Sequence, residues 1–261
     1  MPSPAVPSPA PDLDHLALLR TLQGAFAASI GAVAPDSRVP WCGRWRVRDV
    51  VVHLARIHHW AAAEARGSRE VPLGRGPFDL EPFYRACAAE LTETLARLGP
   101  DAVCSTLVGR GPASFWRRRQ VHETLVHLWD VRTVGGLAVD VNPAVWADTV
   151  DEVVTVMQPR QVRLGRMPPL AHTLALVADD VVAPDGAVRR WHLGGDDTDP
   201  TRDPTHDRTA GPCDGAAVEV RGPARAVALL LWGRTAPDDA ALRVTGDRAV
   251  LDDVLAQRLT P

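Results

Sequence analysis

The chain has 261 residues, 46% hydrophobic and 23% charged, a composition typical of a folded globular protein of one large or two small domains. Its net charge of -3 gives no electrostatic reason to expect nucleic acid or an anionic membrane as a partner, and no apolar run approaches the roughly 20 residues of a membrane span. All 29 basic residues are arginines, which excludes a lysine nucleophile or Schiff base.

The N-terminal residues and the cysteines indicate where in the cell the protein is expected to be. Residues 1–11 are rich in proline, alanine and serine, without a charged start or an apolar core, and predict a flexible tail rather than a signal peptide or anchor. No C-x-x-C pair occurs, so neither a disulfide framework nor a cysteine zinc site is expected, and a cytoplasmic location is favoured. The cysteines are Cys42, Cys87, Cys104 and Cys213.

The first part of the chain reads as a helical bundle. Asp12 can cap the first helix, Gly99 and Pro100 end the third, and Pro143 can start the fifth. A loop rich in glycine and proline, residues 67–77, follows the second helix. Apolar periodicity predicts helices at residues 12–33, 48–66, 80–98, 117–134 and 143–154.

After about residue 165 the pattern changes to short strands and helices. Strands are expected at 172–177, 187–193, 216–220 and 242–245, and helices at 224–232 and 247–259. The first two strands can pair across a turn at 184–186, and the acidic, proline-rich stretch 194–215 reads as a loop. The predicted fold is a four- or five-helix bundle, residues 12–165, followed by a small α+β domain, residues 166–261.

The helix around residues 117–130 carries the clearest chemical signal. Glu123 and His127 lie one turn apart on the same helix face, and their immediate neighbours are apolar. A carboxylate oxygen and an imidazole nitrogen at this spacing can hold two corners of a divalent ion. The pair alone is more often an exposed pair on an amphipathic helix, so a third ligand is needed.

His53 can be that ligand. It lies between apolar Val52 and Leu54 in the second helix, and it can face Glu123 and His127 if the two helices pack side by side. Three protein ligands with an open fourth position are typical of a catalytic metal. Zinc is the default ion for two histidines and a glutamate, although nickel, iron and manganese fit the same ligands.

Separated motifs can be compared with a known family: WRVRDVVVHLAR at 45–56, FWRRRQVHETLVH at 115–127, VRGPA at 220–224 and LLLWGR at 229–234. They resemble, in order, the motifs of the mycothiol-dependent maleylpyruvate isomerase family. The resemblance spans nearly the whole chain and implies a DinB-like metal-binding bundle with a small C-terminal domain. It also implies His53, Glu123 and His127 as metal ligands and mycothiol, the small thiol of actinobacteria, as cofactor.

The same resemblance implies an enzyme. The chain is expected to be a monomer or a homodimer. A metal-held thiolate would add to an electrophilic carbon of a small substrate. Collapse of the adduct gives isomerisation, as of maleylpyruvate to fumarylpyruvate, whereas retention gives S-transfer. The family places an arginine of the second domain near the catalytic cleft, and Arg234 is the candidate, against its default role as a cation at a helix C-terminus.

Nearby polar residues allow several interpretations. Arg119, one turn before Glu123, can belong to a solvated basic turn or bind a carboxylate of the cofactor or substrate through its planar fork. We interpret His122 as a packing or supporting residue, and His58 and His59 as surface or bundle-end residues.

Two other functions remain open. A metal hydrolase would use bound water as nucleophile and would need a base, for which His122 and His58 are the nearby candidates. A metal- or thiol-binding module would sense or store without turnover.

Overall fold

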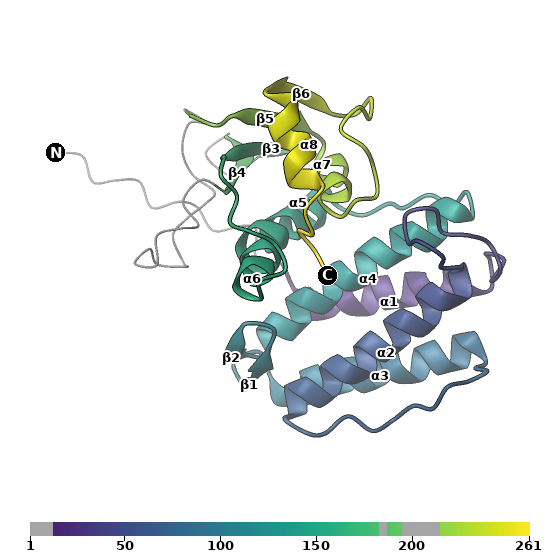
Figure 1. The fold of residues 1–261 in the computed structure, drawn as a ribbon. Helices are drawn as coiled ribbons and strands as arrows, with labels where there is room; N and C mark the ends of the chain where they lie inside the picture. Colours follow the sequence, from purple (N-terminus) through teal and green to yellow (C-terminus); the bar gives the residue numbers. More distant parts are fainter. Residues whose placement is uncertain (1–12, 183–186, 195–214) are drawn as a thin grey trace. The chain divides into compact units, whose positions relative to one another are not determined.

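The protein is described by a computed structural model that covers residues 13–182, 187–194 and 215–261 (Figure 1). Within it the chain forms two compact units, Leu13–Asp140 and Val141–Pro261. The predicted tail, the predicted turn at 184–186 and the interior of the predicted loop 194–215 lie outside the described residues. No helix in the described ranges is long and apolar enough to cross a membrane.

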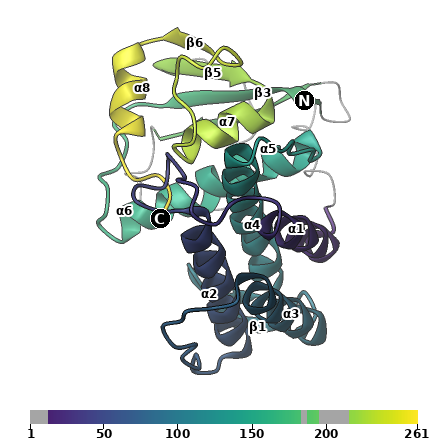
Figure 2. The same ribbon diagram turned by 90° about the vertical axis from the view of Figure 1, so that its right-hand side faces the viewer.

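The first unit is a bundle of long helices (Figure 2). Helix α2 packs against α3 and α4, and α1 packs against the same two helices, so that the four helices enclose a common core. A short antiparallel hairpin, β1–β2, connects α3 to α4 and contacts α2. The elements are α1 (His15–Ile30), α2 (Val47–Arg66), α3 (Leu80–Leu98), β1 (Val103–Thr106), β2 (Gly109–Pro112) and α4 (Ser114–Val134).

The ends of these helices follow from local chemistry. Asp14, rather than the predicted Asp12, caps α1: its carboxylate accepts hydrogen bonds from the backbone N–H groups of Leu16 and Ala17 at 3.1 and 3.0 Å. Gly67 ends α2 with a φ of 64°, a left-handed conformation that glycine adopts without a steric penalty.

Apolar faces hold α2 and α4 in the bundle. Leu54 on α2 and Leu125 on α4 have no exposed surface, and neither does Val121. Burying a side chain of this size contributes about 1.5–3 kcal/mol. This packing brings the helix that carries His53 beside the helix that carries Glu123 and His127, as expected from the sequence.

The second unit is a four-stranded sheet with helices. The strand order is β4-β3-β5-β6; β3 and β5 are parallel and the outer pairs antiparallel. Helix α7 packs on β3 and β5, and α5 packs on α7 (Figure 2). The elements are α5 (Pro143–Glu152), a π-helical turn (Val153–Met157), α6 (Gln158–Arg163), β3 (Leu174–Val182), β4 (Val188–Leu193), β5 (Val218–Gly222), α7 (Ala224–Leu231), β6 (Arg243–Gly246) and α8 (Arg248–Leu255).

The sequence predicted the fold class correctly, a helical bundle followed by an α+β unit, and the antiparallel pairing of β3 with β4. Two features differ. The β1–β2 hairpin was not expected, because glycine and proline in β2 have low strand propensity. The compact units divide after Asp140 rather than near residue 165, since α5 packs on α7 and β3.

Candidate metal centre

Three side chains from two helices converge in the helical unit. One ligand atom from each of His53, Glu123 and His127 lies within 4.8 Å of the other two. The Nε2 atoms of His53 and His127 are 3.3 and 3.4 Å from the same carboxylate oxygen, Glu123 Oε1. Glu123 and His127 are buried, whereas the His53 side chain is 30% exposed, so the cluster can be reached from one side. Two imidazole nitrogens and a carboxylate oxygen at this spacing suit a divalent ion.

Asp130 orients the His127 ring through a hydrogen bond with Nδ1. It lies three residues further along α4, is fully buried, and accepts a hydrogen bond of 2.8 Å from His127 Nδ1. Donation from Nδ1 leaves the Nε2 lone pair directed at the cluster, as in the carboxylate–histidine pairs of metalloenzymes. Burial acts to lower the pKa of His127, but the hydrogen bonds with Asp130 and Glu123 raise it to about 9. The two carboxylates therefore favour a positive charge at Nε2, which a metal ion can supply in place of a proton.

Arg119 neutralises Glu123. The two side chains form an ion pair between Arg119 Nη2 and Glu123 Oε2, one turn apart on α4. Burial acts to raise the pKa of Glu123, but the Arg119 guanidinium and the hydrogen bonds from His127 and His53 outweigh it and hold this pKa well below the usual carboxyl range. Glu123 is thus an anion, with Oε2 on the arginine and Oε1 on the histidines.

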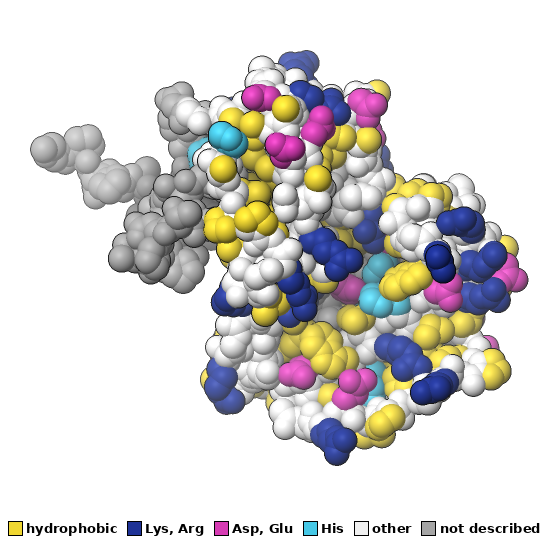
Figure 3. All heavy atoms as spheres, viewed as in Figure 1, with side chains coloured by type: hydrophobic (Ala, Val, Ile, Leu, Met, Phe, Trp, Pro, Cys, Tyr) yellow, Lys and Arg dark blue, Asp and Glu magenta, His cyan; other side chains and the backbone are white. Residues whose placement is uncertain are grey.

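An aromatic ring borders the exposed side of the cluster. Trp45 is only half-buried, and its ring lies 4.7 Å from that of His53 and 6.5 Å from that of His127. The loop before α2 therefore supplies an apolar wall beside the candidate ligands. Figure 3 shows histidine side chains beside an acidic one on this face of the helical unit, with hydrophobic side chains around them.

Comparison with protein families assigns both units. Residues 16–132 match the family model of the mycothiol maleylpyruvate isomerase N-terminal domain, and residues 144–253 match that of the corresponding C-terminal domain. The chain belongs to the mycothiol-dependent maleylpyruvate isomerase family. The resemblance inferred from the sequence motifs is confirmed, and the family is one of enzymes.

Solved structures of this family share the fold. The crystal structure of a mycothiol-dependent maleylpyruvate isomerase is 14% identical, with a TM-score of 0.58 over 92% of this chain and 96% of that one. A histidine-to-alanine mutant of a mycothiol-dependent maleylpyruvate isomerase gives a TM-score of 0.60 at the same identity and coverage. No curated protein sequence matches the chain.

Of the other histidines near the cluster, His58 and His59 differ from the sequence prediction and His122 agrees with it. His58 and His59 are buried rather than on the surface. His58 Nδ1 lies 2.7 Å from Gln120 Oε1, and burial lowers its pKa to about 4, so it is neutral at physiological pH. His59 joins α2 to Glu90 on α3. His122 is fully buried, in keeping with a packing role.

The remaining predicted residues lie elsewhere. Arg234 belongs to the second unit, just after α7; its guanidinium donates to the Trp232 carbonyl at 2.7 Å, and its role in the catalytic cleft stays a prediction. Burial raises the pKa of the Cys87 thiol to about 11, and Cys104 is also buried. Asp130 was missed, although its place three residues after His127 in an apolar helix was a usable signal.

Proposed function

We propose that this protein is a metal-dependent enzyme that uses mycothiol as nucleophile toward a small electrophilic substrate. The observation that carries the proposal is the convergence of His53, Glu123 and His127 ligand atoms within 4.8 Å of one another. Family membership supports the thiol and the isomerase class.

The donor set fits a divalent ion, with zinc as our first candidate. Both histidines direct Nε2 at Glu123 Oε1, and the two helices would supply three protein ligands, the number typical of a catalytic ion. When bound, a divalent ion lowers the pKa of a coordinated thiol and keeps it as the nucleophilic thiolate.

The residues around the ligands have separate tasks. Asp130 accepts the Nδ1 proton of His127 and so fixes the tautomer that offers Nε2. Arg119 pairs with Glu123 Oε2 and so fixes the carboxylate with Oε1 facing the histidines. The Trp45 ring lies 4.7 Å from that of His53 and would shield this ligand from water on one side. We therefore assign Arg119 first to positioning Glu123, and only second to binding a ligand carboxylate.

The reaction we propose is addition of the thiolate to an electrophilic carbon, followed by isomerisation or by retention as an S-conjugate. Maleylpyruvate is the first substrate to test, because the related isomerase is named for it. Arg234 is proposed to bind a substrate carboxylate. The proposed use of mycothiol implies an actinobacterial source. Among the described residues Cys42, Cys87 and Cys104 form no disulfide, which favours the cytoplasm.

The direct test is the metal content of the purified protein, with mycothiol titrated into it by calorimetry. We expect about one equivalent of metal, and loss of both metal and mycothiol binding in His53→Ala and Glu123→Ala. His172→Ala and Glu70→Ala, at exposed positions, are the matched controls. Absence of metal would refute the site, whereas metal without mycothiol affinity would favour hydrolysis. Hydrolysis is the weaker candidate, since His58 and His122, considered as its base, are fully buried.

Arg119→Gln separates the two roles of that arginine. If Arg119 positions Glu123, the variant should bind metal at least tenfold more weakly, since partners of a ligand typically contribute 10- to 100-fold. If it binds a ligand carboxylate, metal affinity should persist and only the KM for substrate or thiol should rise. Arg69→Gln, in the exposed loop after α2, is the control.

A further inference from the structure

Arginines form a row across the sheet of the second unit. In the strand register, Val177 of β3 lies between Arg190 of β4 and Arg221 of β5, and Arg221 pairs with Arg243 of β6. Register partners place their side chains on the same face of a sheet, so the three arginines share one face. Glu219 lies 3.5 Å from Arg190 and 3.0 Å from Arg221 and partly neutralises both. At the other end of the row, Arg243 forms no ion pair with any carboxylate of the described residues.

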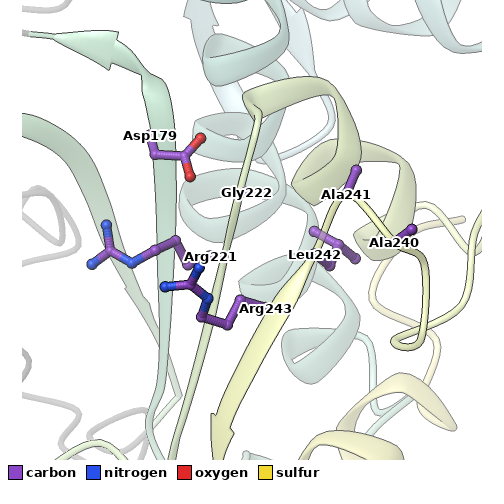
Figure 4. A pocket seen from close by; sticks show the side chains of 7 residues that line it. All are labelled: Asp179, Arg221, Gly222, Ala240, Ala241, Leu242 and Arg243. Atoms are coloured by element: carbon purple, nitrogen blue, oxygen red, sulfur yellow. The ribbon is translucent and has the colours of Figure 1, made fainter.

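A cavity of about 200 Å³ opens at this end of the row (Figure 4). Arg221, Arg243 and Asp179 line it, together with Gly222 and the segment Ala240–Leu242. Figure 4 shows the two guanidinium groups and the Asp179 carboxylate on the same side of the β5–β6 pair. Among the described residues, the side chains of Arg243 and Asp179 form no hydrogen bond or ion pair, although their charges are opposite. The space between them therefore separates two unpaired charges of opposite sign.

Gly222 shapes one wall of the cavity. A Cβ at this position would overlap the carbonyl oxygen of Ala241 and lie 3.1 Å from Leu242 Cδ2. The segment 240–242 can therefore cross β5 closely only because residue 222 has no side chain. Arg221 contacts Glu219 through Nε, so its Nη groups stay available on the cavity side. The cavity is thus bounded by backbone and by three charged side chains.

We propose that this cavity binds a small zwitterion of the amino-acid type. Its carboxylate would lie against Arg243 and the Nη groups of Arg221, since guanidinium binds carboxylate through paired hydrogen bonds. Its ammonium group would lie against Asp179. A phosphate dianion would be repelled by Asp179, and a metal cation by the two arginines, so the charge pattern favours a ligand that carries both signs. The cavity belongs to the second unit, and the proposed function does not depend on it.

The test is a titration of the full chain, followed through the backbone amide resonances of Gly222 and Ala240–Arg243. The probes are glycine, acetate, methylammonium and inorganic phosphate. Because the cavity is open to water, we expect a dissociation constant for glycine of about 1 mM, severalfold lower than for acetate or methylammonium. Arg243→Gln should weaken glycine binding about tenfold, whereas Arg248→Gln on the exposed face of α8 should leave it unchanged.

Asp179→Asn makes the test specific for the zwitterion. It should weaken glycine binding and leave acetate binding equal or tighter, because only the ammonium partner is lost. If Asp179→Asn weakened glycine and acetate binding equally, or if phosphate bound more tightly than glycine, the ligand would not be a zwitterion. Absence of saturable shifts with glycine, or shifts unaffected by Arg243→Gln, would overturn the site itself.

Discussion

At the scale of single residues, Asp130 controls the chemistry of its neighbour. A neutral imidazole carries its free lone pair on either Nδ1 or Nε2. The 2.8 Å hydrogen bond from His127 Nδ1 to the fully buried Asp130 carboxylate keeps the proton on Nδ1 and leaves the lone pair on Nε2. Cys42 adds a further contact, with its Sγ 3.5 Å from Asp130 Oδ2. Asp130 thus acts on the candidate metal site through His127 Nδ1, while Nε2 is the atom that would bind the ion.

We expect Asp130→Asn to weaken metal binding about 10- to 100-fold with the helical fold retained. The amide can donate to Nδ1 and so favour the wrong tautomer, while its size stays the same. Competition with a chromogenic chelator measures the affinity, and circular dichroism checks the fold. Asp140→Asn, at an exposed position in the same unit, should bind as the wild type does. Equal affinities in both variants would show that Asp130 does not orient His127.

Sequence alone predicted some of this cluster and not the rest, for physical reasons. Helical periodicity fixes Glu123 and His127 on one face, so their juxtaposition was predictable. His53 was predictable only as an option, because it depends on α2 packing beside α4. His59 was misplaced on the surface, because its burial depends on Glu90, which is distant in sequence. A contact between residues that are brought together only by helix packing leaves no periodic pattern in the sequence.

At the scale of elements, α2 and α3 are joined by a partly exposed network of charged side chains. His59 lies between two acceptors, with Nδ1 2.6 Å from Glu90 Oε2 and Nε2 2.8 Å from the Val71 carbonyl oxygen. Arg66 donates to the other Glu90 oxygen at 2.7 Å. Burial acts to raise the pKa of Glu90, but the hydrogen bonds from His59 and Arg66 outweigh it and lower this pKa below 4.5. Folding therefore favours the ionised carboxylate.

Glu90→Gln should lower the free energy of unfolding by about 1 kcal/mol at pH 7. A carboxyl group with a lowered pKa in the folded state stabilises the protein above its unfolded pKa, and this contribution is lost as the pH falls through the folded value. Urea unfolding at several pH values should thus show the difference between variant and wild type shrinking below about pH 4.5. A difference independent of pH would contradict the role of the charge. Glu93→Gln on α3 is the control.

Gly222→Ala should destabilise the second unit by about 1–3 kcal/mol, the usual cost of forcing an extra carbon into a packed region. The Cβ of an alanine at position 222 would overlap the Ala241 carbonyl oxygen. Gly24→Ala is the opposite case, since a Cβ on this α1 residue meets nothing within 4 Å. That variant should be more stable by about 0.5–1 kcal/mol because alanine favours a helix. Chemical denaturation compares the two, and equal effects would refute the steric argument.

Most elements could be predicted from sequence because their patterns are local. The C-terminal limit of α3, for example, follows from Gly99 directly after it. In contrast, β1 and β2 pair through backbone hydrogen bonds, with Gly109 and Gly111 in the second strand, and such pairing leaves little trace in side chains.

At the scale of the whole molecule, the candidate metal centre belongs to one compact unit. His53, Glu123 and His127, with Arg119 and Asp130, all lie within Leu13–Asp140. We expect a fragment of residues 13–140 to remain helical and bind about one equivalent of metal. Circular dichroism and elemental analysis test this, with the fragment carrying His53→Ala as control. A folded fragment without metal would place an essential ligand in the second unit.

The division of ligands between α2 and α4 has a thermodynamic consequence. Glu123 and His127 are held together by one helix, but His53 reaches them only when the bundle is folded. An ion bound to all three would act as a cross-link that exists in the native state alone. Each tenfold rise of free ion above its dissociation constant would then add about 1.4 kcal/mol to native stability. The abundance of this protein in a cell would therefore follow the supply of its metal, through resistance to unfolding and degradation.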